Sequence, residues 1–160
     1  NARKRAKKFF NLLYLIRNVR GEMNVPQERK IEILVKTEDN DILNFGNEYK
    51  KDILFLAKAS GLKIDREIEK PKGAAASANE FCEIYIPLEG IIDIEMEISR
   101  LEKEVVKIGQ DHKKTKAKLE NSNFIDRAPK DVIEKEKRKK EEFESKLGKL
   151  ENNLKILKNI

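Results

Sequence analysis

Near the start of the chain, apolar residues recur every three or four positions, which is the spacing that places them on one face of an α-helix. The pattern covers residues 3–23, and its apolar stripe is formed by Phe9, Leu12, Leu13, Ile16, Val19 and Met23. Phe10, Tyr14 and Leu15 widen the apolar surface beyond this stripe. A helix with so broad an apolar surface needs cover on most of its sides. We therefore expect the sequence to begin partway into a larger protein.

Between residues 28 and 90 the apolar spacing shortens to every second position, which is typical of β-strands with one buried face. In the first such segment Ile31, Ile33 and Val35 alternate with polar residues. The predicted strands are residues 30–37, 62–69 and 80–87. Residues 70–79 are rich in Ala and Gly, and we expect them to form a flexible connection between the last two strands.

A helix is predicted between the first two strands, because Ile53 and Leu56 continue an apolar pattern of helical spacing. Its expected N-cap is Asn47 and its last residue Ser60. Gly61 follows at the position where helices often end in a left-handed residue. The expected order in this part of the chain is therefore β-α-β-β, with the helix on one face of a small sheet.

From residue 91 onward the apolar residues follow a heptad, with alternating steps of three and four that define a coiled-coil seam. The first seam is formed by Ile94, Ile98, Leu101, Val105, Ile108, His112, Thr115 and Leu119. The second is formed by Ile133, Glu136, Lys140, Phe143, Leu147, Leu150, Leu154 and Leu157. Because the two rows pair in a constant register about a turn centred near Asp126, they predict a long antiparallel two-helix coiled-coil hairpin.

The paired positions change character along this hairpin. The layers next to its base are apolar, whereas two layers farther out are polar: His112 with Lys140, and Thr115 with Glu136. We therefore expect stability to be concentrated at the base. His112 is interpreted as a tolerated seam residue, because no cysteine, second histidine or paired carboxylate accompanies it as a ligand or acid–base partner.

The corner between the two long helices contains several turn-forming residues. Asn121 and Asn123 are expected to end the first helix and turn the chain. Pro129 should keep the residue before it out of helical geometry and suits the first turn of the second helix. We expect Phe124 and Ile125 to fill the end of the hairpin, with stacking of Phe124 on a nucleic-acid base as the alternative.

Positive charge is concentrated in two places. Residues 1–20 carry seven Lys or Arg and no acid, and residues 112–140 carry 11 Lys or Arg against five acids. Since the whole chain has a net charge of +6, the remainder is acidic overall. This distribution is expected of a protein that contacts a polyanion at two places, although long helices also carry lysine and glutamate simply for solubility.

The predicted elements together give a chain of the α+β class, and composition indicates that part of it is elongated. Charged residues make up 40% and aromatic residues 6% of the 160 positions, which leaves too little apolar material for a deep core throughout. No apolar run is long enough to span a membrane, and no signal-peptide pattern opens the sequence. Cys82 is the only cysteine, so no internal disulfide is possible and a cytoplasmic protein is expected. Because Cys82 alternates with Ile84 and Ile86, it is interpreted as buried filling, with a reactive thiol as the alternative.

Three segments together resemble a known family. They are IRNVRGEMNVP at 16–26, IYIPLEGIIDIEMEISRLEKEVVKI at 84–108 and KLENSNFIDRAPKDVIEKEKRK at 118–139. All three are similar to the C-terminal end of bacterial valyl-tRNA synthetase. The resemblance implies the end of an anticodon-binding domain at 1–27, a small α/β domain at 28–90, and a coiled-coil tRNA-binding arm at 91–160 with its tip at 121–129.

By the same resemblance, the parent protein attaches valine to its tRNA with ATP and Mg²⁺. The family's His-Ile-Gly-His and Lys-Met-Ser-Lys-Ser motifs are absent from this chain. We therefore expect no catalytic residue, no metal site and no cofactor here, and no activity from this part alone. Its expected partners are a valine-accepting tRNA, gripped at the outer corner where the D and T loops meet, and the rest of the parent. A monomer that binds no membrane is expected.

Basic residues around the hairpin corner are the candidate tRNA contacts, through phosphates and shape and not through base sequence. They are Lys113, Lys114, Lys116, Lys118, Arg127, Lys130, Lys135, Lys137, Arg138 and Lys139, and more weakly Arg17 and Arg20. Two alternatives remain at this point. The first alternative is that the hairpin is a protein-docking or dimerisation arm. The second is that the chain is a free-standing nucleic-acid-binding protein.

Overall fold

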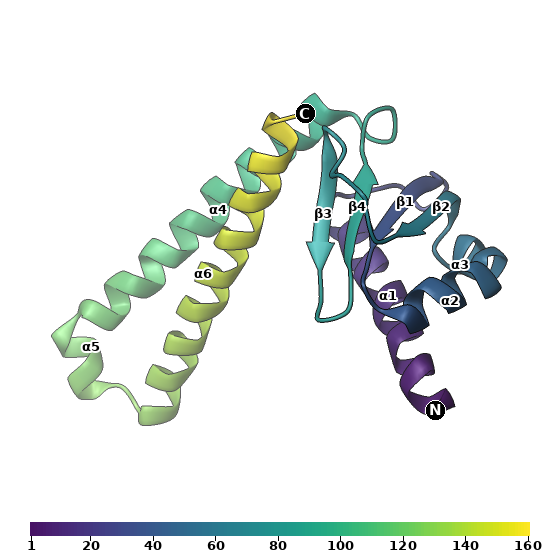
Figure 1. Cartoon of the computed structure of the whole chain (residues 1–160). Helices are drawn as coiled ribbons and strands as arrows, with labels where there is room; N and C mark the ends of the chain where they lie inside the picture. Colours follow the sequence, from purple (N-terminus) through teal and green to yellow (C-terminus); the bar gives the residue numbers. More distant parts are fainter. The chain divides into compact units, whose positions relative to one another are not determined.

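The computed structural model describes residues 1–160, which divide into two compact units. The N-terminal unit comprises residues 1–94 together with 159–160, and it contains a four-stranded sheet and three helices. The hairpin unit comprises residues 95–158, and helices are its only regular secondary structure (Figure 1). The predicted α+β class is confirmed.

The first helix, α1 (Ala2–Glu22), agrees with the prediction for residues 3–23. Its apolar stripe is buried as expected, with Leu12 and Ile16 completely inaccessible. Phe10 and Tyr14, which widen the apolar surface, are 66% and 67% exposed. Part of the broad apolar surface predicted for this helix therefore lies open.

The sheet consists of β1 (Ile31–Lys36), β2 (Ala59–Asp65), β3 (Ala74–Ala78) and β4 (Glu83–Pro87), in the spatial order β2-β1-β4-β3. Strands β1 and β2 are parallel, whereas β4 is antiparallel to both of its neighbours. Parallel strands need a crossover connection, and the chain between β1 and β2 provides one that is helical. The predicted segments 30–37 and 80–87 each contain a strand. The predicted strand 62–69 begins and ends several residues later than β2, with which it overlaps.

The single helix predicted for residues 47–60 is wrong, because the crossover contains two shorter helices, α2 (Asn40–Glu48) and α3 (Lys50–Leu56). The N-cap of α2 is Asp39. Its side chain accepts hydrogen bonds from the backbone N–H groups of Asp41 and Ile42 at 2.9 and 3.2 Å. This cap satisfies N–H groups that the first helical turn leaves without partners, and it starts the helix well before the predicted residue.

The predicted ends of that helix are also wrong. Asn47 lies inside α2, where its side-chain amide donates to the backbone oxygen of Leu43 at 3.2 Å. Ser60 and Gly61 both belong to β2, and Gly61 pairs with Glu32 of β1. The left-handed residue that follows α3 is Lys58, with a φ of 50°.

Residues 70–79 are not a flexible connection, because they contain β3. The strand pairs antiparallel with β4, with Ala76 opposite Tyr85. Alanine has a low intrinsic preference for strands, so the pairing partner decides the conformation here. Helix α1 lies against β3 and β4, and small alanine side chains allow that close approach. The observed order in this part of the chain is β-α-α-β-β-β.

The main core lies on the face of the sheet that the helices cover. It includes Ile33 and Val35 of β1 with Ile84 and Ile86 of β4, all completely buried. The opposite face carries a second, smaller cluster formed by Ile68, Ala74 and Tyr85, with Leu34 and Ala76 packed against it. Alternate residues of β1 and β4 thus serve two different apolar layers, as the period of two in a strand requires.

Cys82 is buried just before β4, with 6% of its surface exposed. Burial raises the pKa of its thiol to about 11, and the negative charge of Asp39 contributes to the rise. A thiol with that pKa is almost entirely protonated near neutral pH, and the thiolate is the reactive form. The prediction that Cys82 is ordinary core filling is confirmed.

The hairpin unit is built from α4 (Ile94–Glu120) and α6 (Lys130–Lys158), which run in opposite directions (Figure 1). Every seam position predicted on either helix is buried or half-buried. Three ion pairs cross between the helices, Lys158 with Glu102, Lys146 with Glu104 and Lys118 with Glu136. The contact of His112 with Glu144 also crosses between them. Partner numbers fall on α6 as they rise on α4, which confirms the antiparallel hairpin.

The corner of the hairpin is a short helix, α5 (Ser122–Arg127), and not a simple turn. Asn121 ends α4 as predicted and caps α5, because its side chain accepts a hydrogen bond from the N–H of Asn123 at 3.0 Å. Asn123 is therefore part of a helix and does not end one. Ala128, which precedes Pro129, is extended with φ −74° and ψ 145°, as the following proline favours.

Candidate nucleic-acid interface

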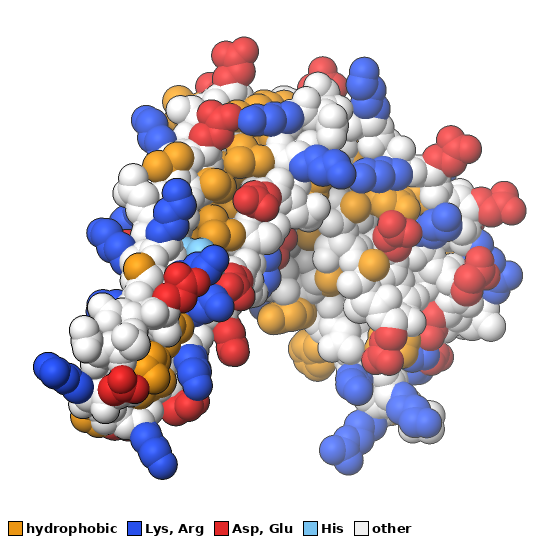
Figure 2. Space-filling view, turned by 90° about the vertical axis from the view of Figure 1, so that its left-hand side faces the viewer, with side chains coloured by type: hydrophobic (Ala, Val, Ile, Leu, Met, Phe, Trp, Pro, Cys, Tyr) orange, Lys and Arg blue, Asp and Glu red, His pale blue; other side chains and the backbone are white.

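The predicted tRNA contacts lie on the distal half of the hairpin unit, around α5. All of these Lys and Arg side chains on α4, α5 and α6 are exposed except Lys139, which is half-buried. Figure 2 shows basic side chains projecting from the far end of the hairpin, with acidic side chains between them. The surface is thus positively charged but not uniformly so.

Ion pairs within the hairpin divide these cations into two groups. Four are paired: Lys116 with Glu120, Lys118 with Glu136, Lys137 with Glu134, and Lys139 with Glu136, at 3.3 to 3.9 Å. The six cations without an ion pair are Lys113, Lys114, Arg127, Lys130, Lys135 and Arg138. The pairs of Lys116 and Lys137 are exposed on both sides and contribute little to stability, so phosphate groups compete with them easily. The six unpaired cations are free to bind an anion at once.

Glu136 differs from the other acids because it is buried in the polar seam layer with Thr115. Their exposed fractions are 7% and 6%. The carboxylate lies 3.3 Å from the ammonium group of Lys139 on α6 and 3.8 Å from that of Lys118 on α4. One buried acid thus holds a lysine from each helix on the basic surface, which the heptad pattern alone did not predict.

His112 forms a second polar contact in the seam. Its Nε2 atom lies 3.0 Å from Oε1 of Glu144, and Lys140 lies 3.8 Å from the same oxygen. The hydrogen bond from His112, together with Lys140, lowers the pKa of the Glu144 carboxyl below its ordinary value. The partner is an acid of the opposite helix, so the interaction joins the two helices of the hairpin. The expectation that no carboxylate accompanies His112 is wrong, because the fold brings Glu144 beside it from a distant part of the sequence. No cluster of His, Cys, Asp or Glu is arranged to hold a metal ion.

At the corner, the apolar side chains fill the hairpin end only in part. Phe124 is half-buried, whereas Ile125 is 38% exposed and Val132, in the first turn of α6, is 37% exposed. The tip of the arm therefore offers a small apolar surface beside Arg127 and Lys130.

The two weaker candidates on α1 have different surroundings. Arg17 is exposed and makes no ion pair or hydrogen bond. Arg20 is partly buried, and its guanidinium donates hydrogen bonds to the backbone oxygens of Pro26, Arg29 and Lys58. Burial lowers the pKa of Arg20 from its ordinary value, and the group stays charged because guanidinium pKa values are so high.

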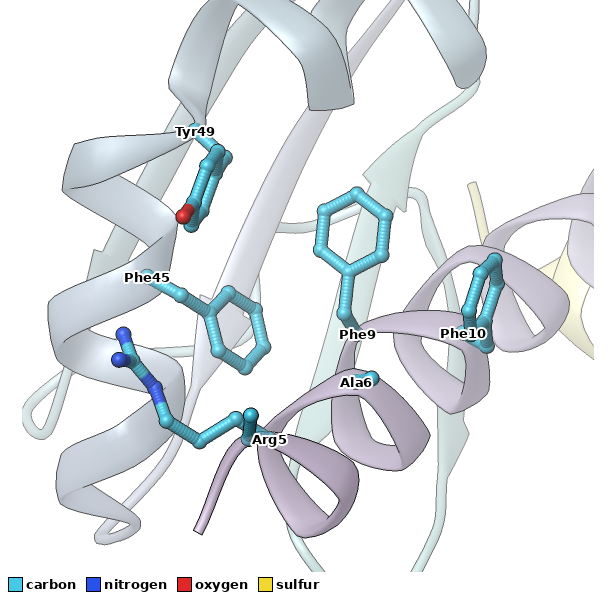
Figure 3. Close-up of a pocket in the computed structure, with 7 residues that line it drawn as sticks. Arg5, Ala6, Phe9, Phe10, Phe45 and Tyr49 are labelled. Carbon is cyan, nitrogen blue, oxygen red and sulfur yellow. The ribbon is translucent and has the colours of Figure 1, made fainter.

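An apolar hollow of about 320 Å³ lies between α1 and α2. Figure 3 shows Phe9, Phe45 and Tyr49 around it, with Phe10, the residue after Phe9, on one side and the Arg5 side chain on another. The Phe9 ring meets Phe45 and Tyr49 edge to face, with centroids 5.8 and 6.3 Å apart. These contacts join the two helices. No helix of the chain is long and apolar enough to cross a membrane.

The hairpin has relatives of known type. Residues 93–158 match the family described as the valyl tRNA synthetase tRNA binding arm. The hairpin is therefore similar, along its whole length, to the arm that this synthetase family carries.

Similarity extends over most of the chain. The chain is 37% identical over 149 residues to the valine–tRNA ligase of Oceanobacillus iheyensis. The aligned region covers 92% of this chain and 17% of that protein. The chain is 36% identical over 128 residues to the enzyme of the same name from Enterococcus faecalis, and this alignment covers 80% of this chain and 14% of that protein. The chain is 33% identical over 147 residues to the valine–tRNA ligase of Aquifex aeolicus, and this alignment covers 92% of this chain and 12% of that protein. The chain belongs to the valyl-tRNA synthetase family and matches its C-terminal part.

Proposed function

We propose that this chain is the tRNA-binding appendage of a valyl-tRNA synthetase, and that its hairpin binds the outer corner of the tRNA, where the D and T loops meet. The observation that carries the proposal is the set of six unpaired, exposed cations on an arm that matches the family's tRNA-binding arm. Elongated basic helices suit the phosphate backbone of RNA, whose duplex grooves offer little sequence to read.

In this proposal the remainder of the parent protein attaches valine to the tRNA, using ATP and Mg²⁺, in the cytoplasm. The chain contributes binding energy to the tRNA body and no catalytic group. An arm of this kind lowers the KM for tRNA more than it changes the rate of the chemical step, because its contacts are made equally before and during the reaction. The chain is proposed to act as a monomer.

The test reverses three unpaired cations of the corner, Lys114, Arg127 and Lys130, to glutamate. Lys118 stays unchanged, because a glutamate there would add a second carboxylate beside buried Glu136. The dissociation constant for tRNA is measured at several salt concentrations. We expect a rise of at least about tenfold and a salt slope that is shallower by about 2 to 3, since each lost phosphate contact removes about one released counterion.

A matched control reverses Lys103, Lys107 and Lys149, which are exposed and unpaired on the proximal half of the hairpin. It changes the net charge by the same amount and should leave the salt slope nearly unchanged. Equal effects of both triple variants would contradict a binding surface at the corner. Sedimentation of the unmodified chain at increasing concentration tests the competing function, because a dimerisation arm would associate without RNA.

A further inference from the structure

A second basic hollow lies in the N-terminal unit, where the end of α1 meets the chain that follows α3. Its volume is about 650 Å³. Three of its lining residues are the cations Arg17, Arg20 and Lys58, and none of its lining residues is acidic. The positive charge of this hollow is therefore not neutralised by its own walls, unlike much of the charge on the hairpin.

The floor of the hollow is held rigidly by Arg20. Its guanidinium donates to the backbone oxygens of Pro26 and Arg29 at 2.9 Å and to that of Lys58 at 3.3 Å. One side chain thus ties α1 to both connecting segments that border the hollow. A floor that is fixed in this way loses little conformational entropy when the hollow binds a ligand.

The backbone at the rim is unusual. Asn24 and Lys58, with φ values of 52° and 50°, are the only residues other than glycine in the left-handed region, and both line the hollow. Each follows a helix, where a left-handed residue is common, and asparagine accepts that conformation readily. A lysine does not, and the cost of such a backbone is of the kind that functional sites retain. The position of Lys58 therefore calls for a role of its side chain.

The polar side chains at the rim are donors. The ammonium group of Lys58 donates to Oε1 of Gln27 at 2.6 Å, which fixes the carboxamide and leaves its N–H₂ group free to donate. Arg17, one turn before Arg20 on the same side of α1, is exposed and unpaired. A guanidinium, an ammonium and an amide N–H together favour an anion with several acceptor oxygens, as a phosphate has.

We propose that this hollow is a second RNA-binding site, in which Arg17, Lys58 and Gln27 hold phosphate groups of the backbone of the same tRNA that the hairpin binds. The inference rests on the proposed function of the hairpin. No aromatic side chain lines the hollow, so it offers no surface on which a base stacks, and the contact is to phosphate and not to sequence.

The test replaces Arg17 and Lys58 together by glutamine in the full chain. We expect the dissociation constant for tRNA to rise several-fold at about 0.15 M salt and the salt slope to become shallower by about 1 to 2, one unit for each lost phosphate contact. The matched control, Lys36→Gln with Lys63→Gln, removes two exposed, unpaired lysines of the same unit outside the hollow. It should leave the slope unchanged.

Lys58→Gly separates binding from folding. Glycine adopts the left-handed conformation without strain, so the variant should melt no lower than the unmodified chain and still bind tRNA more weakly. Full tRNA affinity in this variant and in the double variant would overturn the proposal. If the hairpin triple variant loses affinity while both hollow variants keep it, only the second site is wrong. If no variant loses affinity, the proposed function fails as well.

A chemical footprint identifies the ligand directly. The chain is treated with an amine-acylating reagent alone, with tRNA, or with millimolar inorganic phosphate, and modification of Lys58 is measured by mass spectrometry. We expect protection by tRNA at concentrations near its dissociation constant and none by inorganic phosphate. Protection by phosphate without protection by tRNA would assign the hollow to a free anion and overturn the RNA site.

Discussion

At the scale of single residues, Lys8 and Asp39 join α1 to the start of α2. The ammonium group of Lys8 lies 2.6 Å from Asp39 and 2.7 Å from Asp41. Burial of the Asp39 carboxyl opposes its ionisation. The hydrogen bonds from Lys8 and from the N–H groups of Ile42 and Asp41 outweigh burial, and the pKa of Asp39 lies below its ordinary value. The Asp39 carboxylate thus caps α2 and also holds α1 in place through Lys8.

This arrangement predicts how stability depends on pH. A carboxyl whose pKa is lower in the folded state stabilises the fold above its unfolded pKa of about 3.9, and that contribution is lost as the pH falls toward the folded pKa. We expect Asp39→Asn, which keeps an oxygen for the cap, to lower the free energy of unfolding by about 1 kcal/mol at pH 6. Urea denaturation between pH 6 and 3 should show this difference shrinking, and a constant difference would contradict the charge effect.

At the scale of elements, the hairpin was predictable because its signal repeats. A heptad sustained over two long segments fixes helix length, direction and the buried face together, and the ion pairs between α4 and α6 agree with that direction. The short elements of the N-terminal unit were not predictable in this way. Asp39 starts α2 through a local hydrogen bond, and β3 is a strand only because β4 pairs with it.

Sequence also indicated the basic corner but not how its charges are arranged. The exposed cations follow from the composition of residues 112–140. Three of the four paired lysines bind an acid three or four residues away on the same helix, a spacing that the sequence contains. The pairing of Lys118 with Glu136 depends on the opposite helix, which the composition does not reveal. The hollow beside α1 was signalled only by Arg17 and Arg20, because Gln27 and Lys58 reach it through loop geometry that no periodicity encodes.

The buried layer of Thr115 and Glu136 leads to a prediction for the hairpin element. Replacing buried ionic groups by apolar residues of similar size is often neutral or stabilising, provided that no charge is left buried without a partner. The side chains of Lys118 and Lys139 both reach solvent, so their charges stay in water when Glu136 is replaced. We expect Glu136→Leu to raise the free energy of unfolding of the hairpin by about 1 kcal/mol in urea denaturation followed by circular dichroism. Glu134→Leu, at an exposed position of the same helix, should change it by less than about 0.5 kcal/mol.

The opposite sign for Glu136→Leu would mean that the contacts with Lys118 and Lys139 contribute more than desolvation costs. Glu136 would then be a stabilising part of the arm. The comparison therefore measures how much stability the hairpin gives up to keep a polar layer beside its basic surface.

At the scale of the whole molecule, the chain carries two separately packed units with different sources of stability. The N-terminal unit has a layered core around β1 and β4, whereas the hairpin relies on one apolar seam that becomes polar toward its far end. Molecules built from such parts need not unfold in a single cooperative step. A signal dominated by helix content reports mostly on the hairpin.

The position of Cys82 offers a way to follow the other unit alone. It is the only sulfhydryl in the chain, and it is sealed inside the sheet-containing part. An alkylating agent should therefore modify it only when that part opens, at a rate set by its opening equilibrium. Urea concentrations that melt the coiled coil should leave alkylation slow. Alkylation that accelerates together with loss of helix would instead show that the two halves of the chain open as one.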